Sequence, residues 1–402
     1  MKKGNKKKQK WTKRRHRFYR NLVCLAFGWF CKLKYHIRPV KFKEAKKRQY
    51  LILFNHQTGY DQFFVGLSFP CPVYYVASED IFSMGLASSI IRHLVAPIPI
   101  KKQATDVHAV MNCMRVAREG GTIAMAPEGN RTFHGEPVFI NPAVAPLARK
   151  LGLPIALYRI EGGYGVQPRW SDVVRKGKMR SYVSRVIEPE EYAQMTDDEL
   201  CAVIREELYV NEVKVDGIYH HKKNAEYLER AIYVCPKCGL STFESKGDLI
   251  SCKKCGLTVR HLPTKELEGV GCDLPFRFVA DWYHYQCDFM RGFDALSHIE
   301  APLYKEPVSL FEVIPYKKKV KLNKDIQVVL YGDRLTLDGT TYAFGDISAI
   351  SVLGKNKLNI YLGKQILQLK GDKRFNALKY LNMYYRWRGL TKGGTNGEFL
   401  GL

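Results

Sequence analysis

Short apolar runs alternate with stretches of helical periodicity between residues 38 and 225. Five of the runs are apolar almost throughout and predict buried strands: Tyr50–Phe54, Val73–Val76, Ile98–Ile100, Thr122–Met125 and Ile155–Tyr158. Between them, Ala104–Glu119 and Asn141–Leu151 predict helices. Because strands that alternate with helices are typical of layered folds, we predict an α/β domain with a mostly parallel sheet.

The pattern changes after residue 308, where short β-rich runs follow one another between Gly-containing turns. Six runs predict strands: Ile326–Tyr331, Arg334–Leu337, Thr341–Phe344, Ile347–Leu353, Leu358–Leu362 and Gln365–Leu369. A helix is predicted after them from Phe375, Leu378, Leu381 and Tyr385 at helical spacing. Antiparallel strands closed by one helix resemble a pleckstrin-homology (PH) or GRAM-like module, which is a small β-barrel-like domain. Such a module binds lipids or proteins, or serves only as a packing unit.

Near the N-terminus lies an uninterrupted apolar run, Leu22–Cys31, that Lys32 and Lys34 close. At about 1.5 Å per residue, a helix of this length reaches roughly half-way across a bilayer core, so it does not span a membrane alone. Its Trp29 and the flanking basic residues are typical of an interfacial membrane anchor. A buried core helix is the first alternative. A signal peptide is the second, although a small-residue cleavage site is lacking.

Charge strengthens the membrane interpretation. Of the net +25, residues 1–50 carry +18, with 19 Lys or Arg and one acidic residue, Glu44. Such a block attracts polyanions, either nucleic acid or an anionic bilayer, and the apolar run beside it favours the bilayer. We therefore predict a monotopic or peripheral protein on the cytoplasmic face of the cell membrane. A hydrophobic content of 46% excludes a disordered chain.

Two polar motifs follow predicted strands of the α/β domain. The first, Asn55-His56-Gln57-Thr58-Gly59-Tyr60-Asp61, has the form NHxxxxD. Histidine is the side chain best suited to accept a proton near pH 7, and a carboxylate five residues later can reach its second ring nitrogen. By itself, this pattern also occurs in turns with only a structural role.

The second motif is Ala126-Pro127-Glu128-Gly129-Asn130-Arg131-Thr132. A glycine lets the backbone approach a ligand, and arginine offers two parallel donors to a phosphate. The alternative is a polar turn with a surface Glu–Arg pair. Between the two motifs, Lys101 and Lys102 add two cations at the end of another predicted strand.

In their order along the chain, these motifs and Leu153-Pro154-Ile155 resemble the glycerolipid acyltransferase family, which forms phosphatidate from lysophosphatidate. The resemblance covers roughly residues 38–210. It implies that His56 is the general base toward the 2-hydroxyl of the acceptor and that Asp61 orients it. It also implies that Glu128, Gly129, Arg131 and Thr132 bind the acceptor, with Arg131 on its phosphate and Lys101 and Lys102 facing the same phosphate.

The resemblance also implies an acyl-CoA or acyl-ACP co-substrate, hence a CoA thioester or acyl carrier protein as partner, a lysophospholipid acceptor, contact with anionic membrane lipids, and no catalytic cofactor. The chain departs from the family pattern at Lys101 and Lys102, where arginine is usual, and at Ala126, Asn130 and Ala156. These changes concern the acceptor more than the chemistry. Another lysolipid, glycerol phosphate or an amino-lipid therefore stays open as acceptor.

Four of the eleven cysteines form two Cys-x-x-Cys-Gly turns, Cys235/Cys238 and Cys252/Cys255, with 13 residues between the pairs. Four thiolates at this spacing predict a closed, structural Zn²⁺ site in a zinc ribbon, with strands Ile232–Val234 and Leu249–Ser251 leading into the turns. A thiol redox pair is the alternative. We interpret the other seven cysteines as buried free thiols in a reducing compartment.

The sequence thus predicts five parts. They are a basic and apolar membrane anchor (1–37), an acyltransferase domain (38–225), a zinc ribbon (230–262), a helical connector containing Phe276–Phe289 (263–305) and a PH/GRAM-like domain (306–390). Two functions of other classes stay open. One is a nucleic-acid-binding protein that uses the basic tail and the ribbon, although the apolar run that follows the tail argues against nucleic acid as its partner. The other is a membrane scaffold that has lost activity.

Overall fold

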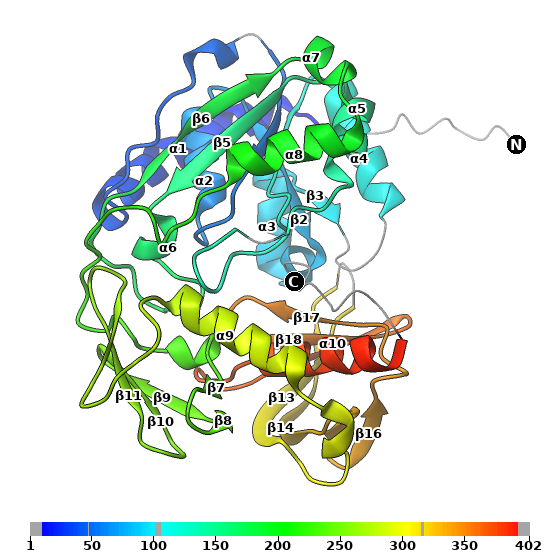
Figure 1. The fold of residues 1–402 in the computed structure, drawn as a ribbon. Helices are drawn as coiled ribbons and strands as arrows, with labels where there is room; N and C mark the ends of the chain where they lie inside the picture. The colour runs from blue at the N-terminus through cyan, green and yellow to red at the C-terminus, as the bar shows by residue number, and fades with distance from the viewer. Residues whose placement is uncertain (1–9, 47, 101–105, 138, 315–316, 393–402) are drawn as a thin grey trace, which may run out of the picture.

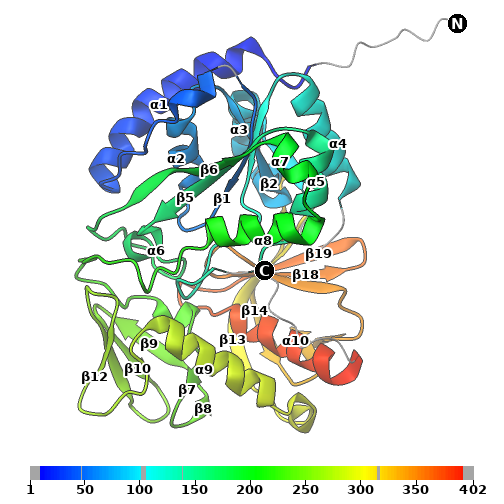
Figure 2. The same cartoon turned by 45° about the horizontal axis from the view of Figure 1, so that its top comes forward.

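The computed structural model describes residues 10–46, 48–100, 106–137, 139–314 and 317–392. Figures 1 and 2 show two lobes, with the N-terminal α/β part above and the remaining chain below. The chain passes from the upper lobe to the lower one through the loops that precede the ribbon, drawn in green in Figure 1.

The upper lobe is built on a six-stranded sheet of order β3-β2-β4-β1-β5-β6. Its strands are β1 Leu51–Phe54, β2 Val73–Ser78, β3 Ile98–Ile100, β4 Thr122–Met125, β5 Ile155–Glu161 and β6 Arg180–Ile187. The first five are parallel, and β6 is antiparallel to β5. This confirms the predicted α/β fold with a mostly parallel sheet, and each of the five predicted strands is present.

Helices cover both faces of this sheet, because successive strand residues point to opposite sides. Leu51 and Leu53 of β1 pack in one core with α4 (Val107–Arg118), α5 (Val144–Leu151) and α8 (Asp197–Leu208). Ile52 and Phe54 pack in the other with α1 (Arg14–Lys34) and α2 (Asp61–Ser68). The upper lobe also holds α3 Leu86–Val95, α6 Gly163–Val166, α7 Pro189–Ala193, η1 Lys43–Lys46 and η2 Glu79–Ser83. Burial on both faces explains the continuous apolar runs.

The N-terminal apolar run lies inside a longer, amphipathic helix. α1 begins at Arg14 and packs against α2 and α3, and the rings of Phe27 and Phe63 stack with centroids 3.8 Å apart. On the opposite side of α1, Leu25 and Trp29 are about 70% exposed. One face of α1 is therefore packed against the upper lobe, and the other exposes apolar side chains. Within the described part of the chain, none of the helices combines the length and the hydropathy that a membrane-spanning segment needs.

Short strands form the ribbon: β7 Val234–Cys235, β8 Gly239–Leu240, β9 Phe243–Lys246, β10 Leu249–Cys252, β11 Thr258–His261 and β12 Leu267–Gly269. β9–β12 form one antiparallel sheet, and β7 and β8 form a separate pair. The strand predicted at Ile232–Val234 begins only at Val234. Its first residues instead continue the turn of η3 (Leu228–Arg230), since Ile232 N–H donates to the Leu228 carbonyl at 3.1 Å.

A seven-stranded antiparallel sheet of order β16-β15-β14-β13-β19-β18-β17 follows. Its strands are β13 Tyr304–Glu312, β14 Val320–Leu330, β15 Arg334–Leu337, β16 Thr340–Ala343, β17 Ala349–Leu353, β18 Lys357–Leu362 and β19 Gln365–Lys370. The helices of this lobe are α9 Val279–Gly292, η4 Ala295–His298 and α10 Leu378–Lys392. The half-barrel with its closing helix confirms the predicted architecture. Phe375 precedes α10, because the Asn376 side chain accepts the Leu378 and Lys379 N–H groups and so starts the helix there.

One hydrophobic core runs through the whole lower lobe. It includes Cys235 and Ile250 of the ribbon, Trp282 of α9 and Leu367 of the half-barrel. Trp282 also donates its indole N–H to the Val234 carbonyl at 2.8 Å. Figure 2 shows α9 and α10 along the front of this lobe, with α9 beside the ribbon and α10 against the half-barrel. The sequence boundaries at residues 262 and 305 therefore fall within one packed unit.

Candidate active site

His56 and Asp61 lie beyond the carboxyl end of β1, the edge of a parallel sheet where α/β proteins place ligands. His56 Nδ1 is 2.8 Å from Asp61 Oδ2. The Asp61 side chain is fully buried, whereas that of His56 is 26% exposed. The imidazole therefore connects a buried carboxylate with open space, and Nε2 is the ring nitrogen available to a substrate.

Local backbone geometry holds the Asp61 carboxylate in place. Asp61 is the first residue of α2, and it accepts the N–H groups of Gln57 at 2.7 Å and Thr58 at 2.9 Å. The Thr58 hydroxyl donates to Asp61 Oδ1 at 2.6 Å. These donors fix the position of the carboxylate, and its Oδ2 next to His56 Nδ1 favours the tautomer with the ring proton on Nδ1. Burial lowers the pKa of His56, against the opposing effect of the Asp61 hydrogen bond, so the ring is neutral at neutral pH.

The second motif follows β4 and contacts the first. Gly129 has φ +71°, a left-handed conformation that favours glycine, and its N–H donates to the Ala126 carbonyl at 3.0 Å. This turn places Glu128 beneath the histidine, where its Oε1 accepts the His56 backbone N–H at 3.3 Å. Burial raises the pKa of Glu128 to about 8. The Arg131 guanidinium reaches the first motif, since a Cβ on Gly59 would lie 4.0 Å from Arg131 Nη1.

Arg169 is a site residue that the sequence did not predict. It is 3% exposed and its guanidinium donates to the Arg131 carbonyl at 2.9 Å. The same guanidinium donates to the Gly354 carbonyl at 2.9 Å and the Val352 carbonyl at 3.1 Å. It therefore links the second motif to the turn between β17 and β18 in the lower lobe.

A cavity of about 1140 Å³ opens beside the dyad. His56, Glu128 and Arg131 line its polar end, together with Leu353 and Gly354 of the β17–β18 turn. The rest is bounded mainly by apolar side chains of α1, α2, α3, α4 and α5, among them Phe27, Leu67, Leu94, Val110 and Leu147. Ligand pockets in proteins usually enclose roughly 300–1,000 Å³, so this space can hold a long apolar group.

The structure brings together His56, Asp61, Glu128, Gly129 and Arg131, as the two motifs predict. Thr132 differs, because it is 1% exposed, is not among the residues that line the cavity, and its hydroxyl accepts the His134 and Gly135 N–H groups. Its position supports a role in shaping the loop and does not support contact with an acceptor. Lys101 and Lys102 lie outside the described residues.

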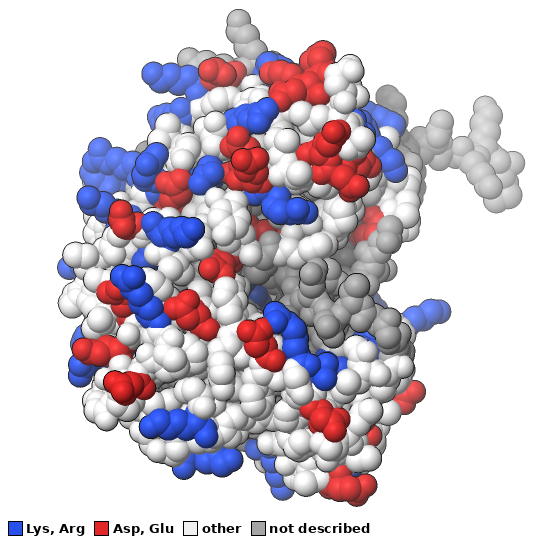
Figure 3. All heavy atoms as spheres, in the orientation of Figure 1, with Lys and Arg blue, Asp and Glu red and all other residues white. Residues whose placement is uncertain are grey.

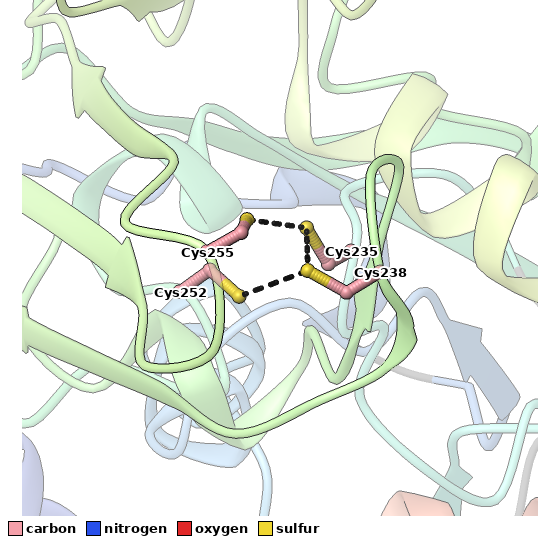
Figure 4. A group of neighbouring side chains, drawn as sticks. All are labelled: Cys235, Cys238, Cys252 and Cys255. Atoms are coloured by element: carbon pink, nitrogen blue, oxygen red, sulfur yellow. Dashed lines mark hydrogen bonds between the residues drawn. The ribbon is translucent and has the colours of Figure 1, made fainter.

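The four ribbon cysteines converge on one point, as Figure 4 shows. Sγ–Sγ distances are 3.7 Å for Cys235–Cys255, 3.7 Å for Cys235–Cys238 and 3.9 Å for Cys238–Cys252. Tetrahedral zinc with Zn–S bonds of about 2.3 Å requires sulfur separations of about 3.8 Å, so the cluster fits zinc. Gly256 and Gly239, which follow the pairs, have φ +76° and +70°, and this explains the glycine in each turn.

Comparison with known proteins gives a family match for part of the upper lobe. Residues 35–160 match the family described as Acyltransferase, a range that contains the dyad, the second motif and β1–β4. The matched range is less than half of the chain, and it includes the part of the molecule that carries the site.

Among solved structures, the chain is similar to that of the 1-acyl-sn-glycerophosphate (LPA) acyltransferase PlsC from Thermotoga maritima. The identity is 21% and the TM-score is 0.40, over 50% of this chain and 78% of that one. A similarity this low says nothing of the substrate of this chain. None of the curated proteins matches it significantly.

Proposed function

We propose that this protein is a membrane-associated O-acyltransferase that moves a fatty acyl group from an acyl thioester to the 2-hydroxyl of lysophosphatidate. The observation that carries this proposal is the His56–Asp61 dyad at the polar end of a large apolar cavity, within an acyltransferase domain. The choice of lysophosphatidate rests on the resemblance of both motifs to the glycerolipid acyltransferases.

In this proposal His56 is the general base. Its Nε2 removes the proton of the acceptor hydroxyl while the hydroxyl oxygen attacks the thioester carbonyl carbon. The tetrahedral intermediate then collapses, the carbon–sulfur bond breaks, and the imidazolium returns the proton to the leaving thiolate. Asp61 holds the ring and stabilises its positive charge between these two steps. The reaction therefore ends with an ester, a free thiol and neutral His56.

The two ends of the cavity support different roles. Arg131 lies near Gly59 of the first motif and offers a planar donor group to the acceptor phosphate. Glu128 stays protonated below about pH 8, so it adds no negative charge that would repel that phosphate. The apolar walls suit an acyl chain whose thioester end reaches His56.

An apolar stripe on α1 supports docking to a bilayer. Phe18, Leu22, Leu25, Trp29 and Leu33 are 55–70% exposed and recur at intervals of three or four residues, so they share one face of the helix. Basic residues flank the stripe in both end turns of α1. Acidic side chains gather instead over α7 and α8, in the upper part of Figure 3, and α8 covers the opposite face of the sheet from α1. This polarity orients α1 toward an anionic surface.

We further propose that Cys235, Cys238, Cys252 and Cys255 hold a structural Zn²⁺. The sulfur separations support tetrahedral coordination by four thiolates, which leaves no open position for catalysis. Because Cys235 and Cys252 lie in the core of the lower lobe, the metal would contribute to the folding of that whole lobe.

The test is an assay with labelled acyl donor, lysophosphatidate and anionic vesicles, which compares the wild type with His56→Ala. His108→Ala, on the exposed side of α4, is the matched control. We expect phosphatidate from the wild type and the control and none from His56→Ala. Full turnover by His56→Ala would refute the mechanism. A wild type that acylates only another lysolipid, glycerol phosphate or an amino-lipid would keep the chemistry and change the acceptor.

A further inference from the structure

Three side chains outside the cavity converge between the two lobes. His134 and Glu136 belong to the loop after the second motif, and His284 lies on α9. His284 Nε2 is 2.8 Å from Glu136 Oε2, and His134 Nε2 is 3.8 Å from the same oxygen. The three ligand atoms all lie within 4.8 Å of one another. Two imidazoles and one carboxylate thus face a common point.

These separations fit a bound transition metal. With zinc–nitrogen and zinc–oxygen bonds of about 2.0–2.1 Å, tetrahedral coordination places neighbouring ligand atoms roughly 3.3 Å apart. The separations of the two histidine nitrogens from Glu136 Oε2 are each within about 0.5 Å of that value, and the two nitrogens lie within 4.8 Å of each other. The His284 side chain is 53% exposed, which leaves one side of the cluster open to water as a fourth ligand.

Surrounding groups orient the three ligands. Asn211 Nδ2 donates to the second carboxylate oxygen of Glu136 at 3.1 Å. The His134 ring stacks on Tyr283 with centroids 4.5 Å apart, and its Nδ1 is 3.4 Å from the Thr132 hydroxyl. Contacts of this kind to the outer atoms of ligands are typical of metal sites, where they fix ring orientation. They also leave His134 Nε2 directed at the cluster centre.

We propose that His134, Glu136 and His284 form a second metal site that takes Zn²⁺ or a similar divalent transition ion. Imidazole nitrogen with carboxylate oxygen suits such ions, with zinc among the most tightly held. Because two ligands come from the acyltransferase domain and one from α9, the ion would fasten the second motif to the lower lobe. The site is separate from the four-cysteine cluster in both residues and ligand chemistry.

The test is the metal content of the purified full chain after zinc loading and dialysis, by elemental mass spectrometry. We expect Glu136→Gln and His284→Ala to hold one zinc equivalent fewer than the wild type. His298→Ala is the control, since the ring of this η4 histidine hydrogen-bonds to Ser297 and Asp294 and is not one of the three proposed ligands, so this variant should keep the wild-type zinc content. After cobalt substitution, the His134–Glu136–His284 site should add weak visible bands to the thiolate bands of the cysteine cluster. Both variants should lack these added bands and keep the thiolate bands.

Equal metal content in the wild type and Glu136→Gln would overturn the proposal and leave a plain hydrogen-bonded contact. The result for Glu136→Gln tests the proposal even if His284→Ala fails to fold. Glutamine keeps the size of the side chain, and its oxygen can still accept from Asn211. Asn211→Ala should weaken zinc binding at this site by about tenfold. The difference between variants does not depend on whether the cysteine cluster is loaded, since all of them retain it.

A second inference rests on the proposed function and on a different observation, the contact of the β17–β18 turn with the cavity. Leu353 and Gly354 line the polar end together with His56 and Arg131. Arg169 fixes this turn to the second motif through its three hydrogen bonds. At the same contact, Lys355 Nζ donates to Asp172 Oδ1 at 2.8 Å. We infer that the turn is a wall of the acceptor site and determines which head group fits.

Its test is the KM of acceptor and acyl donor in Leu353→Trp, with Leu362→Trp as control. Leu362 is also half-buried but ends β18, at the opposite end of that sheet. We expect the acceptor KM to rise about tenfold in Leu353→Trp alone, with an unchanged donor KM. An acceptor KM at the wild-type value would overturn this inference only. A wild type inactive on every lysolipid would instead refute the proposed function.

Discussion

Replacing Asp61 with asparagine tests the proposed chemistry most sharply. The Asp61 carboxylate accepts from Gln57, from Thr58 and from the His56 ring, and it is fully buried. Asparagine keeps the size but replaces one oxygen with an NH₂ group. If that NH₂ takes the place of Oδ2, it meets the Gln57 N–H donor and offers a proton to His56 Nδ1. His56 would then carry its own proton on Nε2, and the base would be lost.

Two magnitudes follow from this change. In a Ser-His-Asp site the same substitution lowers kcat by about 10⁴ through the wrong histidine tautomer, and we expect a loss of that order here. One buried N–H left without its acceptor should lower the free energy of unfolding by about 1–3 kcal/mol. The protein should therefore remain folded while activity nearly disappears.

The assay is acyl transfer by Asp61→Asn, with Asp281→Asn as control. Asp281 also accepts backbone N–H groups at a helix start, those of Arg277 and Phe278, but it lies on α9. The control should lose about 1 kcal/mol of stability and keep its rate. Since burial lowers the pKa of His56, the acidic limb of the wild-type pH–rate profile should lie below pH 6.5. A rate for Asp61→Asn within tenfold of the wild type would refute the base mechanism.

Three further outcomes are expected. The Glu128 carboxyl has a pKa of about 8 in the folded protein and about 4.5 in the unfolded chain. The free energy of unfolding of the wild type, relative to Glu128→Gln, should therefore fall by up to about 5 kcal/mol as the pH rises from 4.5 to 8. Urea titrations that give the same difference between the two proteins at both pH values would contradict this. Cys235→Ser should lose zinc and melt at a lower temperature, and a variant with full zinc and unchanged melting would argue against the metal. Trp29→Glu should weaken binding to phosphatidylglycerol vesicles at least about tenfold, unlike Leu322→Glu on β14, and equal loss in both would disprove docking through α1.

In the upper lobe, the sequence predicted the strands that are short, continuous apolar runs. β1 and β4 are continuous apolar runs because helices cover both sides of the parallel sheet. β6 was not predicted, since Arg180–Ile187 is an edge strand that mixes exposed polar residues with apolar ones. β13 was missed for a similar reason, as Pro307 and two glutamates interrupt its pattern. Composition along one strand does not reveal which face a partner covers.

Those parts of the site whose residues are close together in the sequence could also be predicted. His56 and Asp61 meet across five residues at a helix start, and Glu128, Gly129 and Arg131 belong to one turn. Contacts between segments that are distant in the sequence could not be predicted, because no motif connects them. Glu136 and His284 are 148 positions apart in the sequence (284 − 136), with the whole ribbon between them.

Arg169 shows why a boundary between lobes drawn from the sequence is misleading for function. A fully buried guanidinium needs acceptors for its donors, and three backbone carbonyls provide them, one from the second motif and two from β17 and the turn after it. Removing the half-barrel would leave that cation without two acceptors beside the proposed phosphate site. Through Arg169, the C-terminal sheet thus supports the position of Arg131, although more than 200 residues separate Arg131 from Gly354 in the chain.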